Sequence, residues 1–330
     1  MLDALQVLML DNRLFYHHDT FSHTEVMLYS GLRACGVNVI VYPWNERYHA
    51  PAVMPTDAWN LQFWNMRGGM NGITQQPYSY EQVCRMRFDL LIATTRLTDT
   101  PAGYDFLRGA RDHFRVPFAL LRTEDGGNAA WGIEDADIRF CADVPVDSTE
   151  DVYPLGQCIM YPLAMLAARE KIYGVHCWMS EYNNRRIHLI QFLRQLEGTH
   201  FVGEPRRDGG IGIIPYLEAL TQSQIKYGIR GNGYNSQHLW EGLGAEGVML
   251  IGDFEHRMPP PLPQPDIHYV KLDDENIIEQ ARFWLANEEA RHCIAVWSRQ
   301  WVYDHHTPKH RGLYFLERCK ERIPNFRWQT

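Results

Sequence analysis

The residues whose types and spacing could do chemistry are concentrated between Gly231 and Glu241. Gly231 and Gly233 allow a tight turn and a close approach of the backbone to a ligand, and Asn235-Ser236 are good residues for starting a helix. The amino end of a helix presents unpaired N–H groups and a partial positive charge, which favour phosphate. Glu241 lies about one and a half turns further and could accept hydrogen bonds from both hydroxyls of a ribose. The stretch therefore predicts a nucleotide-diphosphate site; the alternative is a plain turn before a short helix with Glu241 on the surface.

Proton transfer needs a second group, and the loop YHHDTF supplies candidates in His17, His18 and Asp19. Histidines clustered on a loop are also common surface residues. Glu124 and Asp125 follow another apolar run, where they could shape an acceptor pocket or simply form a turn with the next two glycines. No histidine or acid group has a strong metal-ligand spacing, so we expect no metal site.

The first half of the chain has several nearly continuous apolar runs, and these must position its candidate groups. Such runs are typical of parallel strands covered on both faces. A capping-box spacing at Ser22 and Glu25 predicts a helix that ends near Gly36. The predicted strands cover residues 5–10, 37–42, 88–95, 116–122 and 138–144. We expect a Rossmann-like domain over residues 1–165 on the acceptor side.

The second half repeats the alternation of helices and strands, which predicts a second parallel sheet over residues 166–305 on the donor side. The join lies between about residues 151 and 174. Residues 306–330 form a last helix, with Thr307 as N-cap and Pro308 at its first position, and this helix packs back on the first domain. The expected fold is α/β, with two Rossmann-like domains facing a cleft at the carboxyl ends of their strands.

Composition excludes several classes of protein. The formal net charge is −8, from 32 Lys+Arg and 40 Asp+Glu, so no broad basic face is expected and nucleic acid is not the favoured partner. The pairs Arg185-Arg186 and Arg206-Arg207 are interpreted as solvated positions. Seven scattered cysteines without a C-x-x-C spacing indicate reduced thiols in the cytoplasm. No run of 18 apolar residues is present, so membrane insertion is not expected.

Two segments resemble a known family. GYNSQHLWEGLGAEGVMLIGDF and the later ARHCIAVWSRQWVYDHHTPKHRGLYFLERC resemble the C-terminal half of GT-B glycosyltransferases, especially the spore-maturation-protein-B-like (CgeB-like) group. That group has a pattern like G-x-G-x-x-S-x-R-x-W-E-x-L-x-x-G before an apolar strand and a late pattern like H-T-x-x-x-R. The resemblance covers roughly residues 199–319.

The resemblance implies a metal-independent glycosyltransferase that uses a nucleotide-diphosphate sugar, with a UDP-sugar as co-substrate and no other cofactor. It places Glu241 at the donor ribose, and Arg206 or Lys226 could add positive charge. The residues implied at the donor diphosphate are Gly233, Tyr234, Asn235 and Ser236. His238 stands where the family often has Arg, which weakens the assignment of this residue to the donor diphosphate. Gly233 stands where retaining enzymes have an acid, so retaining chemistry is not supported, and the stereochemical outcome stays open.

Three other functions stay open from the sequence. Gly231-x-Gly233 with Asp253 imitates half of a dinucleotide fingerprint, which would suit an NAD(P)-dependent oxidoreductase, although Ser236 replaces the third glycine. A non-catalytic nucleotide-binding module is the second. The third is a glycosyltransferase that acts on modified DNA bases, which would need a basic surface around the cleft.

Overall fold

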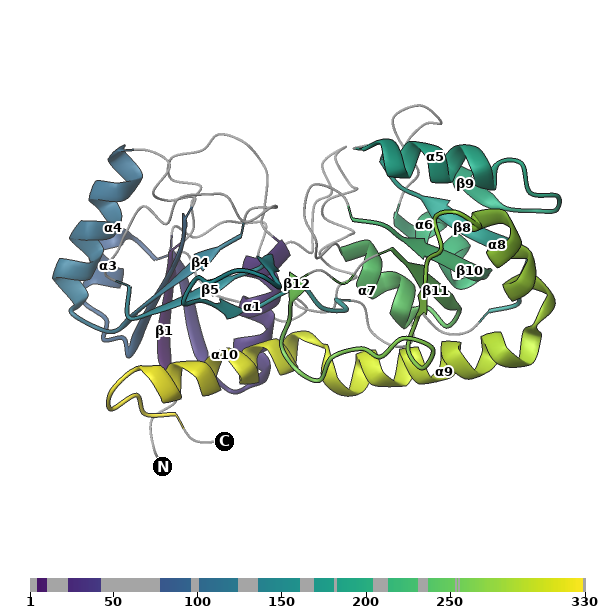
Figure 1. The fold of residues 1–330 in the computed structure, drawn as a ribbon. Helices are drawn as coiled ribbons and strands as arrows, with labels where there is room; N and C mark the ends of the chain where they lie inside the picture. The colour runs from purple at the N-terminus through teal and green to yellow at the C-terminus, as the bar shows by residue number, and fades with distance from the viewer. Residues whose placement is uncertain are drawn as a thin grey trace.

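The computed structural model describes residues 5–10, 23–42, 78–95, 101–123, 136–160, 169–180, 183–203, 213–230, 237–252, 254 and 256–328. Within these ranges the chain forms two parallel sheets in separate lobes, joined along one side by two long helices (Figure 1).

The first sheet has the order β2-β1-β3-β4-β5-β7, and all of its pairings are parallel. Its strands are β1 Gln6–Leu10, β2 Asn38–Tyr42, β3 Leu90–Thr94, β4 Phe118–Arg122, β5 Ile138–Cys141 and β7 Tyr153–Pro154. Helices α1 His23–Ala34, α3 Tyr80–Cys84 and α4 Pro101–Phe114 belong to this lobe. All five predicted runs contain a strand, because continuous apolar residues suit a sheet that is buried on both faces.

The second sheet has the order β13-β11-β10-β8-β9, again parallel throughout. Its strands are β8 Tyr173–Trp178, β9 Phe201–Gly203, β10 Ser223–Gly228, β11 Val248–Ile251 and β13 Val270–Lys271. Its helices are α5 Asn184–Leu193, α6 Ile213–Thr221, α7 Gln237–Gly244, α8 Ile277–Ala286 and α9 Glu288–His305. When the strands of each sheet are numbered in chain order, both sheets begin 2-1-3-4-5. Ligands bind such sheets at the carboxyl ends of the strands where the order reverses, here between β1 and β3 and between β8 and β10.

The chain crosses back to the first lobe through α10 Pro308–Arg322, drawn in yellow below the first sheet in Figure 1. This helix packs on α1 at two glycines. A Cβ on Gly31 would lie 2.1 Å from Pro308 O, and one on Gly312 would lie 2.4 Å from the Gly31 carbonyl carbon. Glycine at both positions therefore lets the two helices meet backbone to backbone.

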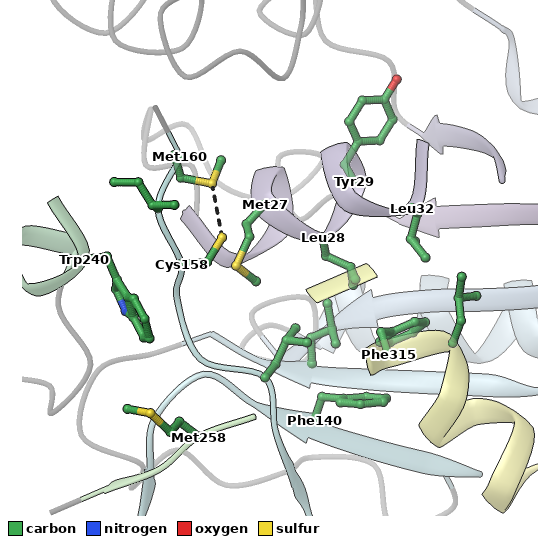
Figure 2. Packing of buried hydrophobic residues seen from close by; sticks show 14 of the residues in the cluster. Met27, Leu28, Tyr29, Leu32, Phe140, Cys158, Met160, Trp240, Met258 and Phe315 are labelled. Carbon is green, nitrogen blue, oxygen red and sulfur yellow. Dashed lines mark hydrogen bonds between the residues drawn. The ribbon is translucent and has the colours of Figure 1, made fainter. Parts of the chain in front are cut away.

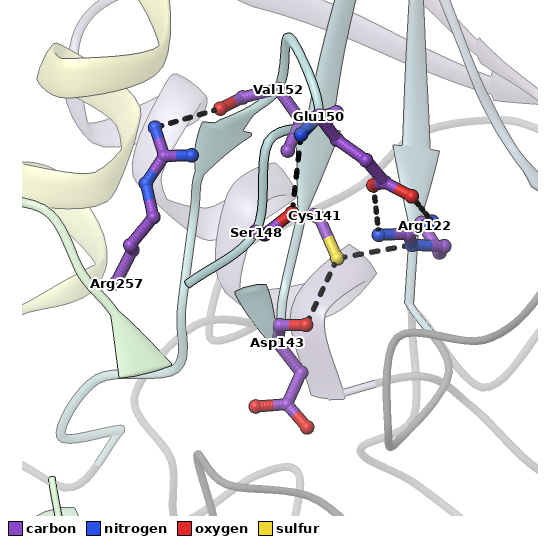
Figure 3. Close-up of polar contacts among 7 residues, drawn as sticks. All are labelled: Arg122, Cys141, Asp143, Ser148, Glu150, Val152 and Arg257. Atoms are coloured by element: carbon purple, nitrogen blue, oxygen red, sulfur yellow. Dashed lines mark hydrogen bonds and ion pairs between the residues drawn. The ribbon is translucent and has the colours of Figure 1, made fainter. Parts of the chain in front are cut away.

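Two short strands also link the lobes. β6 Val144–Pro145 pairs antiparallel with β12 His256–Arg257, and Arg257 Nη2 donates to Val152 O at 3.3 Å (Figure 3). One apolar core continues across this junction: Met27 and Phe140 of the first lobe and Trp240 and Met258 of the second belong to the same buried cluster (Figure 2).

Candidate functional site

The carboxyl ends of β8 and β10 are held together by Arg186, which is only 5% exposed. Its Nη1 donates to Ser180 O at 3.1 Å, beyond β8, and its Nη2 donates to Ile229 O at 2.6 Å, beyond β10. Asn183, the N-cap of α5, accepts from Arg186 N and donates to Arg230 O at 3.1 Å. The interpretation of this arginine as a solvated position is wrong, because its guanidinium satisfies carbonyls that the end of the sheet leaves without strand partners.

The predicted helix is α7, which follows β10 in the sequence, and its first turns carry a buried polar group. Glu241 is 4% exposed, and its Oε2 accepts a hydrogen bond from the hydroxyl of Tyr216 on α6 at 2.8 Å. The same hydroxyl lies 2.8 Å from Nδ1 of His238. Because Tyr216 has one hydroxyl hydrogen, it donates to one of these acceptors at a time.

The tautomer of His238 follows from its other contact. Its Nε2 lies 2.8 Å from Tyr227 O, and since a carbonyl only accepts, Nε2 carries the hydrogen. Burial lowers the pKa of His238, and Glu241 opposes that shift without reversing it. Both ring nitrogens therefore have partners within the protein, and His238 acts as a bridge between α6, α7 and β10.

Lys226 and His176 lie deeper, as register neighbours on β10 and β8. Lys226 is fully buried, and its Nζ donates to Ala245 O, at the carboxyl end of α7, at 3.3 Å. Burial, with Lys171 nearby, holds the pKa of Lys226 well below its ordinary value. The structure therefore places this amino group at the opposite end of α7 from the predicted phosphate site.

The other predicted site residues lie outside the described residues, so their placement stays a prediction. They are His17, His18, Asp19, Glu124, Asp125, Arg206, Gly233, Tyr234, Asn235 and Ser236. The strands before two of these groups are described: β1 leads to the histidine loop, and β4 leads to Glu124 and Asp125.

Sequence reasoning missed Tyr216 and His176. His176 is completely buried, stacks on Phe201 with ring centroids 5.5 Å apart, and lies 5.9 Å from the His238 ring. Burial, with His238 and Lys226 nearby, holds the pKa of His176 well below its usual range. Neither residue stands in a local motif, because their partners come from other strands and helices.

In the described part of the chain, no group of three or more His, Cys, Asp or Glu side chains could hold a metal ion. All seven cysteines are free thiols, as the sequence predicted. None of the described helices is long and apolar enough to cross a membrane.

Comparison with solved structures identifies the architecture. A glycosyltransferase from Rickettsia africae ESF-5 is 10% identical and superposes over 98% of this chain and 100% of that one, with a TM-score of 0.57. Anabaena HepE in complex with UDP and glucose is 9% identical, over 96% and 100% of the two chains, with a TM-score of 0.58. Sucrose-phosphate synthase from Thermosynechococcus elongatus is 8% identical, over 96% and 98%, with a TM-score of 0.50.

The fold is that of GT-B glycosyltransferases. This confirms the expected α/β fold with two Rossmann-like domains. No family model matches the sequence, and no curated protein matches it. At about one identical residue in ten, the similarity establishes the GT-B fold, and the reaction has to be argued from the site.

Proposed function

We propose that this protein is a metal-independent glycosyltransferase that moves a sugar from a nucleotide-diphosphate sugar, with UDP as the nucleotide, to a hydroxyl acceptor. The observation that carries the proposal is the buried carboxylate of Glu241. It lies on α7, the helix that follows β10, where the strand order reverses, and it accepts a hydrogen bond from Tyr216 on α6. The GT-B fold supports it, as does the complex of Anabaena HepE with UDP and glucose. We also propose a relation to the CgeB-like group, because two segments of the sequence resemble motifs of that group.

Glu241 accepts hydrogen bonds from the ribose hydroxyls in this proposal. An ionised carboxylate accepts from two hydroxyls at once, and the contact to Tyr216 holds it in one orientation before the nucleotide arrives. The role of His238 is to support Tyr216 rather than to touch phosphate, since its Nε2 donates to Tyr227 O and its Nδ1 faces the Tyr216 hydroxyl.

The leaving diphosphate takes its stabilisation from the amino end of α7 and from the segment 231–236 that precedes it, with Arg206 as a further source of positive charge. These groups supply the positive charge that the leaving diphosphate needs, so the proposal gives no role to a metal ion. Transfer also needs a base for the acceptor hydroxyl. His17, His18 and Asp19 are proposed for it because they follow β1, one of the two strands where the order of the first sheet reverses. Glu124 and Asp125 follow β4 and are proposed to line the acceptor side.

The proposed location is the cytoplasm, which the seven free thiols support.

The test is calorimetric titration and thermal shift of the purified protein with UDP, GDP, TDP, CDP, ADP, NAD and NADP, each with and without EDTA. A ligand that binds only the native state raises stability by about 2.7 kcal/mol at a hundred times its Kd. We expect a shift with UDP that EDTA does not change. A response to NAD or NADP alone would replace the transferase with an oxidoreductase.

A pair of carboxylate variants locates the site. Glu241→Ala should weaken UDP binding by about tenfold or more, because a charged acceptor of two hydroxyl hydrogens is lost. Glu218→Ala is the control: it removes a half-exposed carboxylate from α6, the helix of Tyr216, that pairs with Arg169 instead. Equal binding by both variants would remove Glu241 from the site.

A further inference from the structure

The corner where α9 ends and α10 begins, at residues 305–308, packs against the buried side of helix α7. Trp240, which precedes Glu241 and is turned about 100° from it around the helix, is fully buried. Its ring stacks on His306 with centroids 4.9 Å apart, and the Cζ of Arg311 lies 5.3 Å from its centroid. Trp301 stacks on the same ring at 6.1 Å. Figure 2 shows Trp240 beside the segment that carries Cys158 and Met160.

The hydrogen bonds of His306 fix its protonation. Its Nε2 donates to Pro261 O at 3.0 Å, and its Nδ1 then accepts from Arg311 Nη2 at 2.9 Å. Burial, with Arg311 beside it, lowers the pKa of His306 to about 2, so the ring is in the neutral state that these two bonds require.

Arg311 connects this corner to the first lobe. Its Nε and Nη2 donate to Gln157 O at 3.2 and 2.8 Å, and Ile159 N donates to His306 O at 3.0 Å. Gln157 and Ile159 follow β7, the edge strand of the first sheet. The helix that carries Arg311 packs on α1 as well.

Arg311 is a buried charge with neutral partners. Burial lowers its pKa to about 10, so it keeps its proton at neutral pH. Among the described residues its contacts are the Gln157 carbonyl, the His306 imidazole and the Trp240 ring. Neutral partners compensate a buried charge only when they are well aligned, so Arg311 holds all three in one arrangement.

We propose that His306 and Arg311 are positioning residues of the donor site: through Trp240 they hold α7, and with it Glu241, and they fix that helix to the first lobe. This explains the late H-T-x-x-x-R motif, in which Thr307 caps α10 while His306 and Arg311 bind each other across the corner. The identity of the ligand rests on the proposed function, whereas the position of α7 does not.

The experiment compares two substitutions of one residue. His306→Phe keeps a ring against Trp240 but removes both hydrogen bonds, whereas His306→Gln offers a donor and an acceptor. We expect His306→Phe to weaken UDP binding by about tenfold in calorimetry and His306→Gln to bind as wild type does within about threefold. Leu107→Ala, in the separate core cluster of the first lobe, is the control for lost stability, and should leave Kd within about twofold.

Hydrogen exchange measures the position of α7 without any ligand. The amides of residues 237–244 should exchange faster in His306→Phe than in Leu107→Ala at equal loss of Tm, and His306→Gln should restore protection. If wild type binds no UDP, the proposed function fails and the exchange data alone decide the positioning role. Unchanged UDP affinity in His306→Phe, or exchange in α7 no faster than in the control, would overturn the proposal.

Discussion

The two sheets share their strand order but differ in where they bury polar groups. In the first sheet the interiors of β1 to β4 are apolar, and the buried polar residues Thr94 and Arg122 stand at the ends of β3 and β4. In the second sheet His176 and Lys226 lie side by side in the middle of the two central strands, beneath α6 and α7. Polar groups in a strand interior lose hydration and weaken the fold. The second sheet therefore gives up stability on the face that carries Glu241, as expected beneath the proposed donor site.

The buried arginine of the first sheet shows the contrasting arrangement. Arg122 Nη2 lies 2.6 Å from Glu150 Oε2, and its Nε donates to Cys141 Sγ at 3.2 Å (Figure 3). Glu150 is 42% exposed at its side chain, so this charge is balanced by a carboxylate that water also reaches. The first sheet thus keeps its charge at the edge of the core, and four measurements test the difference between the sheets.

The largest effect is expected from the apolar sheet. Leu91→Ala on β3 deletes a fully buried side chain and should lower the free energy of unfolding by about 2–5 kcal/mol in urea titrations. UDP affinity should stay within about twofold, because Leu91 lies in the core cluster that belongs to the first lobe alone. A loss of stability below about 1 kcal/mol would mean that this core collapses easily around a void.

In the second sheet we expect a substitution to raise the free energy of unfolding rather than lower it. Lys226→Met should raise the free energy of unfolding at pH 7 by about 1–3 kcal/mol, because a buried amine is replaced by an apolar side chain of similar length. The folded pKa of Lys226 is depressed, so the unfolded state binds more protons below about pH 10.4 and wild type gains stability as pH rises. The advantage of the variant should therefore shrink between pH 7 and pH 10. A constant difference would contradict a lowered pKa of Lys226 in the fold.

Acid should lower the free energy of unfolding through the buried imidazole of His176. The pKa of His176 in the fold lies well below that of the unfolded chain, so stability falls as pH drops below about 6.5, by at most about 1.4 kcal/mol for each pH unit. His176→Phe keeps a planar ring on Phe201 and removes this contribution. Comparing the slope of unfolding free energy against pH from 7 to 5 in the two proteins checks it, and equal slopes would contradict it.

The smallest effect is expected at the edge of the first sheet. Glu150→Gln keeps an acceptor for Arg122 and removes one charge of a partly exposed pair, so the loss should be about 0.5–1 kcal/mol by urea unfolding. It should become smaller in high salt, since salt screens the exposed side of the pair. A loss above about 3 kcal/mol would show that Arg122 depends on this carboxylate as a fully buried charge does.

Much of the fold could be predicted from local patterns, and the exceptions have identifiable causes. The sequence pattern missed β8, because Gly174 and His176 interrupt its apolar run. Gly174 is needed there because a Cβ would lie 2.8 Å from the His200 ring. The pattern also missed α4, whose buried residues Gly103, Leu107 and Ala110 form only a narrow apolar face. At the site, Glu241 and its helix were predicted, whereas Tyr216 and Arg186 were not.

The sequence by itself determined the apolar strands, the short helix after Ser236 and the N-cap at Thr307, because each depends on residues only a few positions apart. Only the tertiary structure decided which polar side chains meet. Tyr216 reaches Glu241 across 25 positions, and Arg311 reaches Gln157 across 154. Such contacts depend on how whole helices and sheets pack, since a buried polar atom gains a partner only where the fold brings one within reach.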